Sequence, residues 1–280
     1  MIVKGYLFSF LYAVAVLVCG ALAHRLGVKK TYTRKLVHIL VGFEWFILSY
    51  YHKNTPHFLL VCLFFLTLLF IIYRKNWLPM MSSDSDNAPG TVYYALSMSI
   101  LALISVFVPK MLVPFGIGVL ATSLGDGFGG VFGSAIPKKI PLYKRKTLFG
   151  SLAVFFFSFL SVILFDALFT LELGVHEYFA IAFLSSGIEL LCSRGLDNLF
   201  LPLGVSFFSY LLIYVESVRQ MSIALSLTPL LFALTVERKK LTFGGAMTAV
   251  VLNLLVALAF GDKGFSLLIT YFIHAHRVQG

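Results

Sequence analysis

The chain has few charged residues and few cysteines. Only 12% of its 280 residues are Asp, Glu, Lys or Arg, about half the share in a typical soluble domain. Its three cysteines, Cys19, Cys62 and Cys192, lie far apart in apolar stretches, which argues against a disulfide framework or a zinc site. The motifs G-x-x-x-x-G-K-[ST], G-x-S-x-G and H-E-x-x-H are absent, which argues against the enzyme classes that use them.

Apolar residues are abundant, at 59% of the chain, and phenylalanine alone occurs 29 times. No soluble stretch separates the apolar runs, so we predict one membrane domain with an all-α, polytopic transmembrane helical bundle. Several runs are short, and we therefore expect nine to eleven spans. The runs cover residues 5–23, 36–51, 58–73, 92–108, 111–133, 149–171, 177–192, 198–215, 221–236, 243–260 and 264–275.

The distribution of basic residues predicts the orientation. The odd-numbered connections between these runs carry sixteen Lys and Arg residues, and the even-numbered ones carry four. Because basic loops stay in the cytoplasm, we predict cytoplasmic odd loops and an N-terminus outside. A cleavable signal peptide ending at Ala23 is the alternative, but it would place the basic residues from Lys29 to Lys35 outside.

No transit peptide precedes the first run, which favours a prokaryotic cytoplasmic (inner) membrane. The net charge of +10 does not indicate nucleic acid, because the aromatic residues belong to the apolar runs rather than to a basic surface.

Asp126 is a carboxylate inside the fifth apolar run. An ionisable residue at the centre of a membrane helix costs roughly 2.5–3.5 kcal/mol, so it usually has a functional partner. Gly125, Gly129 and Gly133 are spaced by four residues, a pattern that lets membrane helices pack closely. Packing alone leaves the carboxylate unexplained, and Asp126 is therefore a candidate site residue.

The other polar residues near span ends gather at the same predicted cytoplasmic face. The set contains the carboxylates Asp126, Glu189 and Asp197, the cations Arg34, Lys35, Lys144, Arg145 and Lys146, and His38. Magnesium takes one or two carboxylates together with phosphate oxygens, and cations neutralise a transferred phosphoryl group. The set therefore favours a magnesium-bound polyphosphate, although basic loops of this kind also serve topology alone.

The polar motifs also occur in a recognisable order. They are Arg34-Lys35-x-x-His38, Pro89-Gly90-Thr91-Val92-Tyr93-Tyr94, Gly125-Asp126-Gly127, Arg145-Lys146-Thr147-x-x-Gly150-Ser151, Glu189 and Arg194-Gly195-Leu196-Asp197-Asn198-Leu199. This series, over residues 30 to 215, resembles the CTP-dependent lipid alcohol kinases, which include phytol, farnesol, dolichol and CTP-type diacylglycerol kinases. The phytol kinase branch is the most similar.

The resemblance implies transfer of the γ-phosphoryl group of CTP or UTP to an isoprenoid alcohol, such as phytol or a polyprenol, dissolved in the membrane, with Mg²⁺ as cofactor. It also implies a relationship to CDP-diacylglycerol synthases, so phosphatidate cytidylyl transfer is the enzymatic alternative. The alternative of another class is a transporter or channel, in which Asp126 and Glu44 line a proton or ion path.

The resemblance also implies roles for individual residues. The catalytic set is Asp126, Asp197 and His38; the nucleotide set is Arg34, Lys35, Lys144, Arg145, Lys146, Thr147 and Asn198; the metal set is Asp126, Asp197 and Glu189. At one position the chain departs from the family pattern, since Phe149 stands where a glutamate is expected. Loss of that carboxylate would alter the activity.

The chain divides into three predicted parts. Residues 1–30 form a first span and a basic loop, residues 31–218 form the kinase-like membrane domain, and residues 219–280 form C-terminal membrane helices. From Leu241 the last part resembles the opening of a second family, which includes phytyl-phosphate kinases. It is too short for that whole domain, so we expect it to be structural.

Overall fold

The computed structural model describes residues 2–53, 56–75, 77, 89–136, 141–143, 146–237 and 242–278. Nearly all of this chain is helical, which confirms the all-α prediction. The helices are α1 (Ile2–Arg25), α2 (Lys30–Val41), α3 (Glu44–Tyr51), α4 (Pro56–Lys75), α5 (Gly90–Phe107), the 3₁₀ turn η2 (Pro109–Met111), α6 (Leu112–Ala135), α7 (Leu148–Phe169), α8 (Val175–Leu191), α9 (Asp197–Tyr214), α10 (Glu216–Gln220), α11 (Ser222–Glu237) and α12 (Phe243–Val278). A short antiparallel ribbon, β1 (Pro141–Tyr143) and β2 (Lys146–Thr147), precedes α7.

Within the described residues, seven helices are long and apolar enough to cross a membrane: α1, α4, α5, α6 with η2, α7, α9 and α12. The predicted runs outside α1, α4, α5, α6, α7 and α9 are also helical. One corresponds to α2 and α3, which are separated by a break at Gly42 and Phe43, and two correspond to the shorter helices α8 and α11. The last two are the halves of α12, which bends where Gly261 takes a φ of 65°.

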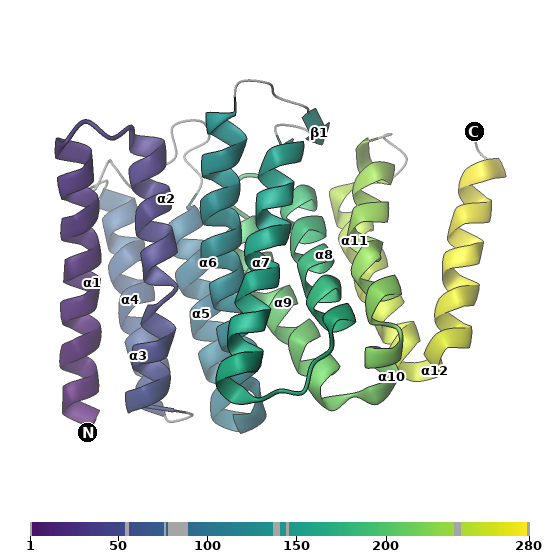
Figure 1. Cartoon of the computed structure of the whole chain (residues 1–280), viewed down its shortest axis with the longest axis horizontal. Coiled ribbons are helices and arrows are strands. Elements are labelled where there is room, and N and C mark those ends of the chain that lie inside the picture. Colours follow the sequence, from purple (N-terminus) through teal and green to yellow (C-terminus); the bar gives the residue numbers. More distant parts are fainter. Residues whose placement is uncertain are drawn as a thin grey trace.

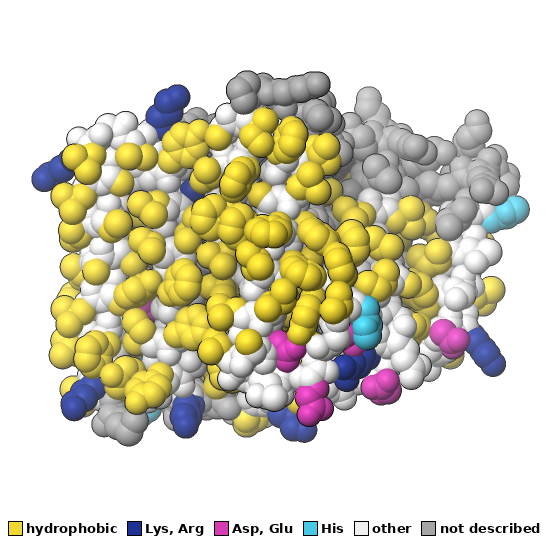
Figure 2. Space-filling model, viewed as in Figure 1, with side chains coloured by type: hydrophobic (Ala, Val, Ile, Leu, Met, Phe, Trp, Pro, Cys, Tyr) yellow, Lys and Arg dark blue, Asp and Glu magenta, His cyan; other side chains and the backbone are white. Residues whose placement is uncertain are grey.

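Successive long helices run up and down, so alternate connections lie at the same end of the bundle (Figure 1). We call one end the ribbon end: it holds β1 and β2, the start of α2 at Lys30 and the turn from Cys192 to Leu196. The N-terminus lies at the opposite end. The side of the bundle seen in Figure 2 is predominantly apolar, and the charged side chains on it gather toward the two ends of the bundle. This distribution is typical of a polytopic membrane protein.

Helix α6 is the most deeply buried of the seven long helices, and its glycines face several neighbouring helices. Gly125, Gly129 and Gly133 pack against α7, while Gly127 and Gly130 pack against α2. The packing interpretation of the four-residue spacing is therefore confirmed. It applies to a different face of α6 from the one that carries Asp126, because Asp126 contacts α2.

Gly118→Ala is expected to destabilise the protein by about 2 kcal/mol. The added methyl group would meet the backbone of α9, and the clash can be relieved only by moving one of the two helices. A Cβ atom at Gly118 would lie 2.5 Å from the carbonyl oxygen of Pro202 in α9. Thermal unfolding in detergent measures the effect. The matched control is Gly244→Ala, since no described residue outside its own turn of α12 lies within 4 Å of a Cβ atom at Gly244. Equal melting temperatures for the two variants would contradict the close packing of α6 on α9.

Candidate functional site

A cavity of about 740 Å³ lies between α1, α2, α4 and α5 and reaches α6 and the start of α9. Its volume is within the range of small-ligand sites. The polar part, toward the ribbon end, is lined by Arg34, Lys35, His38, Arg74, Thr91, Asp126, Arg194, Asp197 and Asn198. The walls farther from that end are mainly apolar, with residues such as Val16, Val41, Leu48, Phe65 and Leu69. The cavity therefore suits an amphiphilic ligand.

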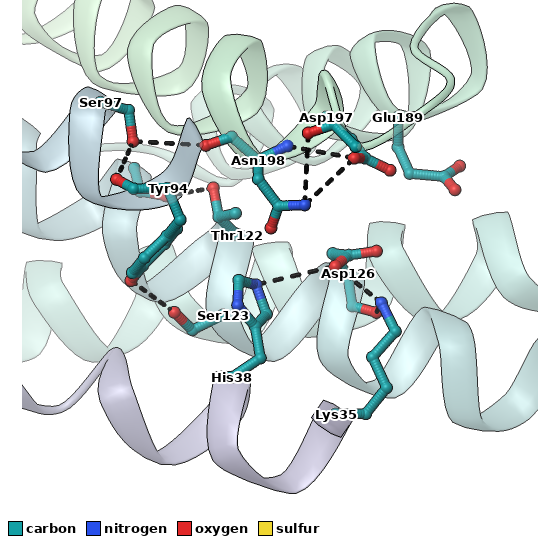
Figure 3. A network of polar contacts seen from close by, with 12 residues as sticks. Lys35, His38, Tyr94, Ser97, Thr122, Ser123, Asp126, Glu189, Asp197 and Asn198 are labelled. Atoms are coloured by element: carbon teal, nitrogen blue, oxygen red, sulfur yellow. Dashed lines mark hydrogen bonds and ion pairs between the residues drawn. The ribbon is translucent and has the colours of Figure 1, made fainter. Parts of the chain in front are cut away.

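Asp126 is paired with two side chains of α2 (Figure 3). Lys35 Nζ donates a hydrogen bond to Asp126 Oδ2 at 2.7 Å and another to the Asp126 carbonyl oxygen at 3.0 Å. His38 Nε2 lies 3.6 Å from Asp126 Oδ2. Lys35 and His38 share a face of α2 because they are three residues apart. The ammonium group of Lys35 compensates the charge of a carboxylate that is almost fully buried.

A second cluster surrounds Lys146 in β2. Its Nζ atom donates hydrogen bonds to Glu189 Oε1 at the end of α8 and, at 3.2 Å, to Asp197 Oδ2 at the start of α9. Burial would lower the pKa of Lys146, but the attraction of Glu189 and Asp197 outweighs burial and raises it. Lys146 therefore remains a cation and joins three chain segments at the ribbon end.

The turn before α9 fixes the position of Asp197 and Asn198. Arg194 and Gly195 have φ values of 56° and 79°, a left-handed conformation that is uncommon for an arginine. Asp197 Oδ1 accepts hydrogen bonds from Asn198 N at 3.1 Å and from Asn198 Nδ2 at 3.3 Å. Ser97 Oγ of α5 donates to the carbonyl oxygen of Asn198 at 3.3 Å. The turn is thus tied to α5 across the cavity's polar end.

Tyr94 is a site residue to which the sequence prediction gave no role. Its hydroxyl group and Ser123 Oγ form a hydrogen bond of 2.9 Å, and its ring meets the His38 ring edge-on with centroids 4.9 Å apart. These contacts orient the imidazole toward Asp126 (Figure 3). The motif that contains Tyr94 was visible in the sequence, but its spacing does not reveal which tyrosine faces His38.

The other predicted site residues have different positions. Arg34 lines the cavity. Thr147 caps α7, because its Oγ1 atom accepts a hydrogen bond from Gly150 N at 3.2 Å. Phe149 is half-buried in the first turn of α7. Lys144 and Arg145 lie outside the described residues.

Asp126, Glu189 and Asp197 lie toward the same end, but their charges are balanced by lysines. The described part of the chain holds no group of three or more His, Cys, Asp or Glu side chains that could bind a metal ion. Magnesium that accompanies a nucleotide needs only one or two protein carboxylates, since phosphate oxygens and water complete its shell. The carboxylates present fit such an ion.

Comparison with known proteins identifies a relative of this chain. The chain is 30% identical to a phytol kinase of Synechocystis sp. over 204 residues, which cover 69% of this chain and 84% of the relative. The chain belongs to the phytol kinase-like family. No protein-family model matches it, and no solved structure does. The relationship to the phytol kinase-like family agrees with the resemblance of the ordered motifs.

Lys146→Met is expected to destabilise the protein by about 3 kcal/mol, because it leaves two buried carboxylates without their cation. Adding Glu189→Gln should recover part of this loss, since one of the uncompensated charges is then removed. Thermal unfolding of both single variants and the double variant measures the coupling. Lys4→Met, at an exposed position of α1, is the control and should have no effect. Strictly additive losses for Lys146 and Glu189 would contradict their pairing.

Proposed function

We propose that this protein is an integral membrane kinase that transfers the γ-phosphoryl group of CTP or UTP to an isoprenoid alcohol, such as phytol or a polyprenol. The proposal rests chiefly on the cavity, whose polar end holds Lys35, His38, Asp126 and Asp197 while its other walls are apolar. Membership of the phytol kinase-like family supports an alcohol as the acceptor. The bias of basic residues supports an orientation with the ribbon end in the cytoplasm. We propose a prokaryotic cytoplasmic membrane as the location.

In this proposal the alcohol lies along the cavity with its hydroxyl group near Asp126 and its chain against the apolar walls. Helices α1 and α4, which form part of these walls, are among the least buried of the long helices. Because these helices would face the bilayer, we expect a lipid to enter the cavity sideways.

His38 is placed to take the proton of the hydroxyl group. Its Nε2 atom is buried and has no hydrogen-bond partner among the described residues, and it lies 3.6 Å from Asp126 Oδ2. The carboxylate of Asp126 would stabilise the imidazolium ion that forms. The edge-on contact with Tyr94 keeps the ring in that orientation.

The triphosphate would lie at the ribbon end, where Lys35, Lys146 and Arg34 supply positive charge. Both lysines are now held by carboxylates, and binding of the nucleotide lets them turn to phosphate oxygens. Mg²⁺ would neutralise charge on those oxygens, and Asp126, Asp197 and Glu189 are the residues that would hold it. The apolar walls around the alcohol would keep water away, so that the phosphoryl group reaches the alcohol rather than water.

Asp126→Asn is expected to lower phosphoryl transfer at least about a hundredfold, because the variant loses the charge that supports His38 and the metal. The assay incubates purified protein in detergent with Mg²⁺, γ-labelled CTP and a panel of phytol, geranylgeraniol, undecaprenol and diacylglycerol. Omission of Mg²⁺ should abolish labelling.

Glu216→Gln is the matched control, because Glu216 is exposed in α10 at the end of the bundle away from the ribbon. It should retain full activity. Absence of label from every lipid with a folded wild-type protein would overturn the kinase proposal. Release of pyrophosphate with phosphatidic acid as substrate would support the cytidylyltransferase alternative instead.

Phe149→Glu is expected to lower the Mg²⁺ concentration needed for half-maximal activity severalfold, because it restores the carboxylate of the family pattern at the first turn of α7. A Mg²⁺ titration of the kinase assay measures the shift, with Phe149→Gln as the uncharged control. The same Mg²⁺ dependence for both variants would show that this position does not contribute to the metal site.

A further inference from the structure

A second, smaller hollow lies between α1 and α4, toward the end of the bundle that holds the N-terminus (Figure 1). We call it the α1–α4 hollow. Its volume is about 270 Å³, and its walls are mainly apolar. They include Tyr6, Ser9 and Phe10 of α1 and Leu60, Val61 and Phe64 of α4. Phe10, Leu60 and Phe64 are each more than half exposed, so the hollow opens on the side of the bundle that would face the bilayer.

The α1–α4 hollow adjoins the cavity of the candidate site at Phe65, which lines both spaces. On α4, Cys62 lines the cavity and its neighbour Val61 lines the hollow. On α1, Tyr12 lines the cavity, and Phe10, two residues earlier, lines the hollow. The two spaces are therefore neighbours between the same pair of helices.

The packed core closes the cavity toward α6 at this depth. Phe58 lies one turn of α4 before Cys62, and its ring stacks on that of Phe115 in α6 with centroids 5.4 Å apart. Phe58 and Phe115 are 1% and 0% exposed. Leu48, the last residue of α3 that lines the cavity, is also buried. A hydrocarbon chain that continues past Leu48 would therefore meet the core on the α6 side and find space on the side of α1 and α4.

The distance from the polar end to the α1–α4 hollow matches a lipid chain of moderate length. Tyr6 packs against His52, directly after α3, with ring centroids 4.9 Å apart. The hollow therefore reaches the level of His52. His52 follows His38 by fourteen residues along α2 and α3, which corresponds to about 21 Å. An extended chain of sixteen carbons is about 19 Å long, and one of ten carbons is about 11 Å long. With its hydroxyl group at His38, the longer chain would reach the hollow and the shorter one would end inside the cavity.

We propose that the α1–α4 hollow binds the far end of the lipid chain and thereby makes the enzyme prefer chains of about sixteen carbons over shorter ones. This inference rests on the proposed function, which places the hydroxyl group of the lipid at His38. Each methylene group that leaves water for an apolar site raises the affinity about fourfold. A chain end that fills the hollow therefore binds more tightly than one that stops in the cavity. The rest of a longer chain would leave through the open side of the hollow into the bilayer and would add little.

The test fills the α1–α4 hollow from its exposed edge with Leu60→Trp. Leu60 lines the hollow and not the cavity, and it is 54% exposed, so the larger side chain should not prevent folding. Binding of decan-1-ol and hexadecan-1-ol to the purified full-length protein is measured by native mass spectrometry and by the ligand-induced shift in melting temperature. Leu60→Trp is expected to weaken binding of hexadecan-1-ol at least about tenfold and to leave binding of decan-1-ol unchanged. Comparing variant with wild type for each alcohol removes the difference between the alcohols in their partition into detergent.

Leu63→Trp is the matched control, because Leu63 is an exposed leucine of the same helix that lines neither space. It should bind both alcohols as the wild type does. Equal weakening of both alcohols by Leu60→Trp would overturn the inference, and so would unchanged binding of hexadecan-1-ol by a folded Leu60→Trp protein.

The kinase assay with the same two alcohols separates this inference from the proposed function. Weaker binding of hexadecan-1-ol alone in Leu60→Trp, without phosphorylation of either alcohol by the wild type, would contradict only the kinase proposal. Phosphorylation of both alcohols by the wild type, with unchanged binding of hexadecan-1-ol in Leu60→Trp, would contradict only the role of the α1–α4 hollow.

Discussion

The ion pair between Lys35 and Asp126 is the contact on which the arrangement of the site depends. A lone carboxylate in the interior of an apolar helix bundle would be strongly destabilising, and the lysine makes it tolerable. Close packing makes the pair possible, because Gly130 has no side chain where the end of Lys35 crosses α6. The approach of α2 to α6 therefore brings Lys35 and His38 to Asp126 together.

The second lysine cluster works in the same way at the ribbon end. Lys146 draws Glu189 and Asp197 together from α8 and α9, and Asp197 is also part of the cavity lining. Lys35, Asp126 and Asp197 line the polar end of the cavity, and Lys146 contacts Asp197 without being part of that lining. In the proposed function, the lysines would pair with the phosphates of the ligand and the carboxylates with its metal ion. No charged group of the two clusters would then be left without a partner. The mainly apolar walls beyond would suit the hydrocarbon chain of the proposed lipid substrate.

Much of the helical architecture followed from the sequence, because apolar runs of membrane length can only bury their backbone groups as helices. The up-and-down order followed as well. Asp126 has the buried partner that its position in an apolar run required, and its role in the site stays a prediction. Local pattern could not reveal the break between α2 and α3 or which lysine pairs with which carboxylate, because both depend on helix packing. The contact of Tyr94 with His38 and the capping role of Thr147 are likewise tertiary or geometric features. Lys144 and Arg145 remain predictions, since they lie outside the described residues.

The most direct measurement is an electron cryomicroscopy structure of the protein with a non-hydrolysable CTP analogue, Mg²⁺ and a lipid alcohol. We predict density for the terminal phosphate between Lys35 and Lys146, and for the alcohol chain along the cavity with its hydroxyl group beside His38 and Asp126. A nucleotide bound away from both lysines, or a cavity without lipid while the alcohol lies elsewhere on the protein, would contradict a combined nucleotide and lipid site at Asp126.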